Sequence, residues 1–134
     1  MASIQKEVLI NVSPEAVWSA LREFGALHTR LAKGFVTDTR LVDEGRKRIV
    51  TFSNGSTAQE ILVGLDDGLK RIAYAVVESP QITQHSASAQ VFDAGENQSR
   101  FVWTTDLLPD AVAPYISAQM DLGAAAIKKT LEEA

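Results

Sequence analysis

The chain has 134 residues, of which 46% are hydrophobic and 22% charged, with no cysteine and a formal net charge of -4 at pH 7. A chain of this length buries roughly two-thirds of the surface that it exposes when unfolded, so it can build a core without a disulfide or a metal. The lack of cysteine excludes disulfide frameworks, zinc ribbons, iron–sulfur sites and thiol nucleophiles. It also permits a reducing cytoplasm, and we expect a cytoplasmic protein.

Charge and hydropathy exclude two further kinds of partner. The 13 basic residues are scattered apart from the short cluster at 46–48, so no basic stripe could follow a nucleic-acid backbone. No segment approaches the roughly 20 apolar residues of a membrane-spanning helix. The N-terminal stretch 1–10 contains Lys6 and Glu7 and does not resemble a signal peptide. We therefore expect no nucleic acid and no membrane span.

The first part of the chain predicts one strand and two short helices. Apolar residues at alternate positions over 4–12, interrupted only by Lys6, have the period of a half-buried strand. Ser13 is a suitable N-cap for a helix that begins at the following proline. Its apolar stripe comprises Val17, Trp18, Leu21 and Phe24. A second short helix is expected over 26–33, with Gly34 in a left-handed conformation at its end.

After residue 34 the apolar period changes to two, which is typical of β-structure. The pattern predicts six further strands at 36–41, 47–53, 57–65, 69–78, 83–92 and 99–108. Asn54-Gly55 and Asp67-Gly68 are strong hairpin signals, and 95–97 is a looser turn of the same kind. Consecutive hairpins of this kind make an antiparallel meander.

Residues 110–133 predict a long amphipathic helix. Its apolar residues recur every three or four positions: Val112, Ile116, Met120, Gly123, Ile127 and Leu131. A helix from Pro114 to Glu133 would span about 30 Å, and only the sheet offers an apolar surface for it. Helices segregated from a mainly antiparallel sheet define the α+β class. No linker or shift of composition divides 1–134, so we expect a single domain.

Several short motifs occur in a family-like order along nearly the whole chain. They are INVSPEAVW at 10–18, GRKR at 45–48, Asn54-Gly55 followed by Glu60, then Tyr74, and Trp103 in the last strand. Together they resemble the START-like, helix-grip superfamily, also called SRPBCC, and within it the polyketide cyclase/dehydrase and lipid-transport group. The resemblance implies a curved antiparallel sheet of six to seven strands wrapped around the C-terminal helix. It also implies an internal cavity for a hydrophobic or amphipathic small molecule.

Strand alternation predicts which charged side chains face such a cavity. A three-residue loop at 54–56 would oppose Val50 to Glu60 and keep Phe52 on the inner face with other apolar residues. On that register Arg48 and Glu60 lie close enough to pair diagonally or through a bound polar group. They form either a polar anchor for a ligand oxygen or a structural ion pair.

The predicted ligand-binding residues are Arg48, Phe52, Glu60, Tyr74, His85, Ala87, Ala89, Trp103 and Met120. His85 is either a general acid or base, a ligand contact, or a structural histidine, which is the commoner case for a lone histidine in a strand. Tyr74 and Trp103 suit either stacking on a flat ligand or core packing.

Small side chains provide space in two predicted elements. Ala87 and Ala89 belong to one strand, where small residues would leave room for a ligand. Met120 and the small residues 123–126 lie on the long helix, where they either permit close packing or leave a void.

Three functions remain open on this sequence. The first is a carrier or sensor for a hydrophobic or aromatic metabolite. The second is an aromatase/cyclase-like enzyme in which Arg48, His85 and Tyr74 polarise carbonyls or move protons. The third is an interaction module similar to the chaperone co-activators that share the fold, which the predicted polar outer face of the sheet disfavours.

Catalytic and metal-binding motifs are missing from the sequence. It contains no G-x-S-x-G, H-E-x-x-H or G-x-G-x-x-G pattern, and its two histidines lie far apart, at positions 28 and 85. We therefore assign no catalytic residue and expect no metal and no cofactor. We favour ligand binding by a monomer or homodimer.

Overall fold

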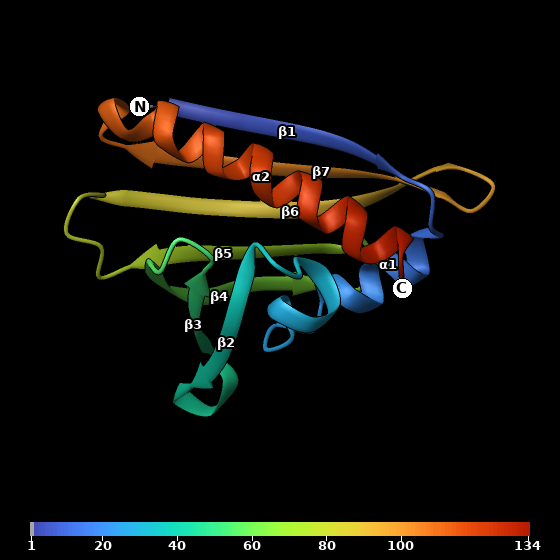
Figure 1. Cartoon of the computed structure of the whole chain (residues 1–134), viewed down its shortest axis with the longest axis horizontal. Coiled ribbons are helices and arrows are strands. Elements are labelled where there is room, and N and C mark those ends of the chain that lie inside the picture. Colours follow the sequence, from blue (N-terminus) through green and yellow to red (C-terminus); the bar gives the residue numbers. More distant parts are fainter. Residues whose placement is uncertain (1) are drawn as a thin grey trace.

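The structure, a computed structural model, describes residues 2–134 and contains a seven-stranded antiparallel sheet that curves around a long helix (Figure 1). The strand order is β1-β7-β6-β5-β4-β3-β2, so the meander runs from β2 to β7 and β1 joins at the β7 edge. The strands are β1 (Ala2–Ile10), β2 (Val36–Val42), β3 (Lys47–Phe52), β4 (Thr57–Asp66), β5 (Arg71–Val77), β6 (Gln84–Gly95) and β7 (Gln98–Leu108).

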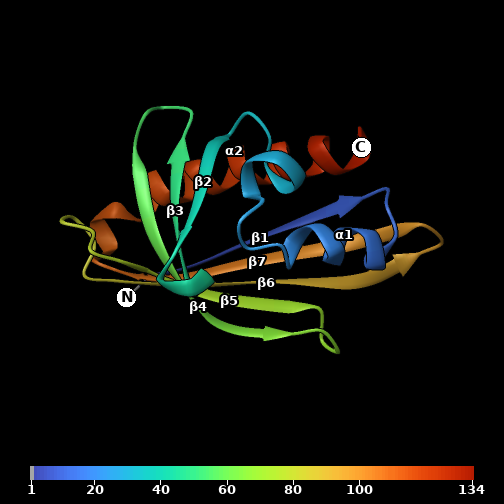
Figure 2. The ribbon, with the colours of Figure 1, turned by 90° about the horizontal axis from the view of Figure 1, so that it is seen from below.

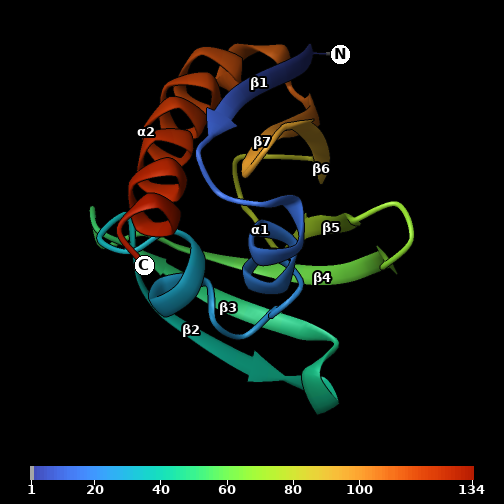
Figure 3. The ribbon, with the colours of Figure 1, turned by 90° about the vertical axis from the view of Figure 1, so that its right-hand side faces the viewer.

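Two α-helices and three short turns complete the described chain. They are α1 (Pro14–Leu21), a π-helical turn η1 (Leu27–Leu31), the 3-10 turns η2 (Asp43–Gly45) and η3 (Asp110–Val112), and α2 (Ala113–Glu132). Seen from its end, the sheet forms an open curve, and α2 lies across the open side (Figure 3). The predicted α+β helix-grip fold is confirmed.

Helix α1 begins as its sequence predicts. The Ser13 hydroxyl accepts a hydrogen bond from the backbone N–H of Ala16 at 3.3 Å, and a proline occupies the first helical turn. The helix ends at Leu21, yet Phe24, beyond its end, is buried with the predicted apolar stripe. α1 covers one end of the curved sheet (Figure 3).

The predicted second helix is shorter than expected. A helix was expected over 26–33, but only the wide turn η1 forms, closed by a 2.8 Å bond from the Ala32 N–H to the Leu27 carbonyl. The helix cannot continue because Ala32 leaves the helical region, with a φ of -131°. Gly34 then adopts a φ of +85°, the left-handed conformation that the sequence predicts.

Two aromatic rings approach helix α2 closely at Gly123. A Cβ atom at Gly123 would lie 3.0 Å from Cζ3 of Trp103 and 3.2 Å from Cε2 of Phe35. The glycine therefore lets both rings pack against the helix backbone, as the close-packing alternative predicts. Within residues 2–134, no helix is both long enough and apolar enough to cross a membrane.

The predicted register of β3 with β4 is wrong by two residues. Arg48, rather than Val50, lies directly opposite Glu60. The turn between the strands has the expected three residues but begins one residue earlier, at 53–55, because the N–H of Phe52 bonds to the carbonyl of Ser56 at 2.9 Å. A shift of two leaves every side chain on its predicted face, so the expected inner face persists.

The outer face of the sheet is less polar than predicted. On β4, Ile61 is 38% exposed and Val63 is 67% exposed. The alternation that turns Glu60 and Leu62 inward already places Ile61 and Val63 on the outer face, so the strand period itself predicts these exposed apolar side chains.

Candidate functional site

A cavity of about 390 Å³ lies between the concave face of the sheet and α2. Its inner part is lined by sheet residues, by η1 and by the middle of α2. Its outer part is lined by residues 56–59 of the β3–β4 hairpin, residues 77–82 of the β5–β6 loop and the start of α2. Figures 1 and 2 place these three segments at the same end of the molecule, opposite α1. We call this end the mouth of the cavity.

The structure brings eight of the nine predicted ligand-binding residues to the cavity. They are Arg48, Phe52, Glu60, Tyr74, His85, Ala89, Trp103 and Met120. Ala87 is the exception: it is buried on the inner face of β6, but it does not line the cavity. Its partner on β5 is Tyr74, whose hydroxyl accepts a hydrogen bond from Trp103 of β7.

Arg48 and Glu60 form a direct, buried ion pair. Each residue is only 6% exposed, and Nε of Arg48 donates to Oε1 of Glu60 at 2.7 Å. Nη2 lies 2.7 Å from the same oxygen, and Nη1 donates to the carbonyl of Phe24 at 3.2 Å. The two side chains therefore form a structural ion pair from directly opposite positions, and not the diagonal pair that the sequence predicts.

Aromatic rings enclose the guanidinium of Arg48 as well. Its Cζ lies 4.1 Å from the ring centroid of Phe24 and 5.2 Å from that of Tyr74. A cation held over aromatic faces gains electrostatic stabilisation there. The guanidinium is thus fixed by a carboxylate, a carbonyl and two rings, and it connects β3 to the segment that follows α1.

Tyr74 and Trp103 meet above the small residues of β6. The indole Nε1 of Trp103 donates to the hydroxyl of Tyr74 at 3.0 Å. Ala87 and Ala89, their neighbours on β6, are too small to separate the two rings. Burial raises the pKa of Tyr74, the negative charge of Glu60 raises it further, and Arg48 opposes both. The phenol therefore stays protonated and can act as a hydrogen-bond donor.

His85 enters the cavity wall just beyond the last paired residues of β5 and β6, Ala75 and Ser86. Its Nδ1 atom is buried and has no hydrogen-bond partner among residues 2–134. Burial lowers the pKa of His85, and the nearby charge of Glu60 only partly opposes this. The imidazole is therefore neutral at pH 7 and carries one N–H donor and one acceptor nitrogen.

The second histidine belongs to a different environment. Nδ1 of His28 lies 3.0 Å from the hydroxyl of Thr39, and neither residue lines the cavity. The two histidines are thus far from forming a joint site. Across residues 2–134, no three His, Asp or Glu side chains gather as metal ligands would.

Sequence reasoning missed several residues that line the cavity. Leu27 and Leu31 line it from η1, and Phe35, beside the β3–β4 hairpin, packs its ring edge-on against Phe52 at 5.4 Å between centroids. At the mouth, Tyr115 accepts a 3.4 Å hydrogen bond from Nδ2 of Asn54. These residues lie in turns or at a helix start, where no periodic pattern shows which way a side chain points.

The family model described as "Polyketide cyclase / dehydrase and lipid transport" matches residues 1–132. The chain belongs to this family. The membership predicted from the short motifs is thereby confirmed. A search of curated proteins found no match.

Solved structures share the fold of this polyketide cyclase/dehydrase family member. An uncharacterized protein from Bacillus thuringiensis matches with a TM-score of 0.86 and 23% identity, over 97% of this chain and 98% of that one. The protein XoxI from Bacillus cereus matches with a TM-score of 0.82 and 24% identity, over 99% and 94%. A norcoclaurine synthase point mutant from Thalictrum flavum, in complex with a transition-state analogue, matches with a TM-score of 0.76 and 19% identity, over 98% and 94%.

Proposed function

We propose that the chain binds a hydrophobic or aromatic small molecule in the cavity between the sheet and α2, as a cytoplasmic carrier or sensor. The cavity itself is the observation that supports this proposal. Its volume of about 390 Å³ falls within the range of roughly 300–1,000 Å³ that is typical of small-molecule sites. Residues 1–134 would act as one ligand-binding domain, in a monomer or homodimer.

The arrangement of polar groups favours binding over catalysis. Arg48 and Glu60 neutralise each other, so neither offers a free charge for polarising a carbonyl. Tyr74 stays protonated because burial raises its pKa. The remaining cavity group with a usual pKa near neutrality is His85, and general acid–base chemistry usually needs a second partner of suitable pKa.

Native mass spectrometry of freshly purified protein tests the proposal. The intact mass is compared with that of the denatured chain, so that a retained small molecule appears as extra mass. We expect a discrete addition in the parent protein. A second measurement adds an uncharged hydrophobic fluorescent probe, N-phenyl-1-naphthylamine, and follows its emission.

A cavity-filling variant locates the binding site. Ala89→Leu places a larger side chain on the cavity wall, and we expect it to lose both the retained mass and probe binding while it keeps the fold. Ala125→Leu makes the same change at an exposed position of α2 and should bind as the parent does. Equal binding by Ala89→Leu and the parent would contradict the proposed cavity site.

A further inference from the structure

The cavity contains polar groups that differ in how well they are paired. Arg48 and Glu60 pair with each other, and the oxygen of Tyr74 accepts from Trp103. His85 differs, because its buried Nδ1 has no partner among residues 2–134. An unpaired buried polar atom is unfavourable. A ligand that forms a hydrogen bond with this atom would therefore remove the free-energy cost of burying it unpaired.

His85 and Tyr74 face the same part of the cavity. His85 lies two residues before Ala87, which is the β5–β6 partner of Tyr74. Diagonal neighbours of this kind on adjacent strands are typically about 7–8 Å apart. No acceptor for the hydroxyl hydrogen of Tyr74 is found in the described part of the chain. An unused donor and an unpaired imidazole nitrogen thus lie within reach of one polar end of a ligand.

The charges around His85 restrict the chemistry of that polar end. Glu60 lies close enough for its negative charge to raise the proton affinity of His85, and Arg48 is already paired with Glu60. A carboxylate or phosphate on the ligand would lose its hydration in the cavity, and Arg48, the cation of the described lining, is already paired and would not compensate this loss. A neutral hydroxyl avoids this cost, and it can donate to a bare nitrogen or accept from an N–H.

We propose that the ligand is an aromatic molecule bearing a neutral hydroxyl group, and that this hydroxyl forms a hydrogen bond with Nδ1 of His85. This inference rests on the proposed function, since it names the class of ligand for the same cavity. The aromatic body lies against the apolar lining, which includes Phe52, Trp103 and Met120. The hydroxyl of Tyr74 provides a second hydrogen bond to the same oxygen.

Two probes of nearly equal shape test the hydroxyl requirement. 2-Naphthol carries a hydroxyl where 2-methylnaphthalene carries a methyl group, and each dissociation constant is measured for the parent and for His85→Leu. The preference of each protein is the dissociation constant of 2-methylnaphthalene divided by that of 2-naphthol. Dividing the preference of the parent by that of His85→Leu cancels the different hydration of the two probes. We expect this ratio to be roughly 3- to 10-fold, as for one hydrogen bond to a neutral group.

Two further variants serve as controls. His28→Leu removes the histidine that pairs with Thr39 away from the cavity, and it should keep the preference of the parent. His85→Asn keeps a polar atom near the position of Nδ1, so we expect it to restore part of the preference that His85→Leu loses. A ratio near one for His85→Leu, with both probes bound, would overturn the proposal and leave the proposed function intact.

Imidazole ¹⁵N NMR of the parent protein tests the bond without any substitution. The chain has two histidines, so each ring can be assigned. We expect 2-naphthol to shift the Nδ1 resonance of His85, while 2-methylnaphthalene leaves it close to its free position. Binding of both probes with no such difference would overturn the proposal. Failure of both probes to bind, together with a clean mass of the free chain, would overturn the proposed function as well.

Discussion

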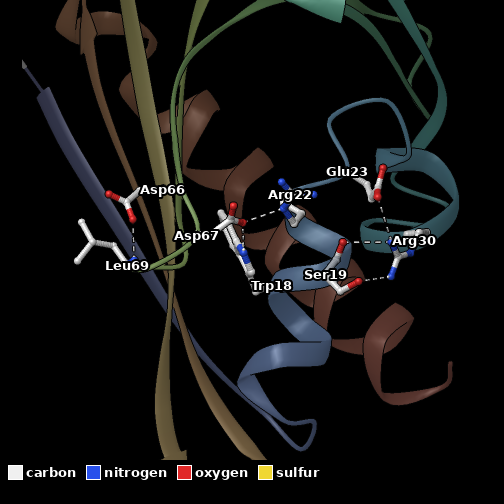
Figure 4. A network of polar contacts seen from close by, with 8 residues as sticks. All are labelled: Trp18, Ser19, Arg22, Glu23, Arg30, Asp66, Asp67 and Leu69. Carbon is white, nitrogen blue, oxygen red and sulfur yellow. Dashed lines mark hydrogen bonds and ion pairs between the residues drawn. The ribbon is translucent and has the colours of Figure 1, made fainter.

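The two ends of the curved sheet differ in how they are held together. At the α1 end, Ile10 and Val17 are fully buried in the core. There Asp67, in the turn between β4 and β5, accepts hydrogen bonds of 2.9 Å from Nε1 of Trp18 and from Nε of Arg22 (Figure 4). The mouth, at the other end, is bridged by the longer 3.4 Å contact between Asn54 and Tyr115.

We call the α1 end the closed end, and further polar contacts there link α1 to η1. Arg30 donates to the carbonyl and the hydroxyl of Ser19, each at 3.1 Å, and its Nη1 lies 3.9 Å from Glu23 (Figure 4). The turn after β4, α1 and η1 are therefore linked in series. This difference teaches that packing and polar links at one end can hold the curvature of the sheet, so that the other end stays open to a ligand.

The largest expected effect comes from Arg48, which links the cavity to the closed end through Phe24. Arg48→Met leaves the buried carboxylate of Glu60 without its partner, and we expect a loss of about 3–5 kcal/mol in the free energy of unfolding. Urea denaturation measures this loss. The double variant Arg48→Met/Glu60→Gln should recover much of it, because no unpaired charge remains. A single variant as stable as the parent would show that the pair does not support the closed end.

A matched pair of isoleucine truncations compares the two ends directly. Ile10→Ala opens a void in the packed core, and we expect it to lower the free energy of unfolding by about 2–5 kcal/mol. Ile116→Ala makes the same change at the mouth, where the side chain already borders open space, and should cost less than about 1 kcal/mol. Thermal and urea denaturation provide both values. Equal losses would contradict the proposed division between the ends.

A smaller effect is expected in the pH dependence of the free energy of unfolding, and it arises from His85 in the cavity. Burial lowers the pKa of His85 in the folded state, against the opposing charge of Glu60. As the pH falls below about 6.5, the unfolded chain binds a proton that the folded chain does not, so stability decreases. His85→Leu should remove this part of the decrease between pH 7 and 5. An unchanged slope in urea midpoints over that range would show that His85 does not titrate abnormally.

The smallest effect is expected at the closed end, and it occurs in more acidic solution. The hydrogen bond from Trp18, followed by that from Arg22, lowers the pKa of the exposed Asp67. Its contribution to stability is complete above the usual carboxyl pKa of about 3.9 and is lost as the pH falls through the lowered value. Asp67→Asn should reduce the acid-side slope of stability below pH 4 and leave the slope between pH 7 and 5 unchanged. His85→Leu should show the reverse pattern, so each variant is the control for the other.

Much of the fold could be predicted because it depends on local periods. The alternation of apolar and polar residues identified the strands, and the turn residues identified their hairpins. Ser13 followed by Pro14 marked the start of α1. The same alternation placed Arg48 and Glu60 on the inner face. These features follow from which side of an element is buried, and a residue's neighbours in the chain already carry that information.

The site could be predicted only in part, because contacts across strands depend on side-chain reach and loop geometry. The exact partner of Glu60 depended on the conformation of the 53–56 turn, which residue types alone do not specify. Ala87 lies outside the cavity lining, and Tyr74 of β5 meets Trp103 of β7 across β6, a contact that no single strand predicts.

The sequence by itself determined the element order, the α+β class, the family resemblance and the inward set of side chains. Only the tertiary structure decided that one end of the sheet is closed by α1, that the other opens beside Tyr115, and that Nδ1 of His85 has no partner within residues 2–134. The physical reason is that periodicity reports the burial of each residue along its own element. A cavity is a space between elements, so its shape is set only when distant segments pack together.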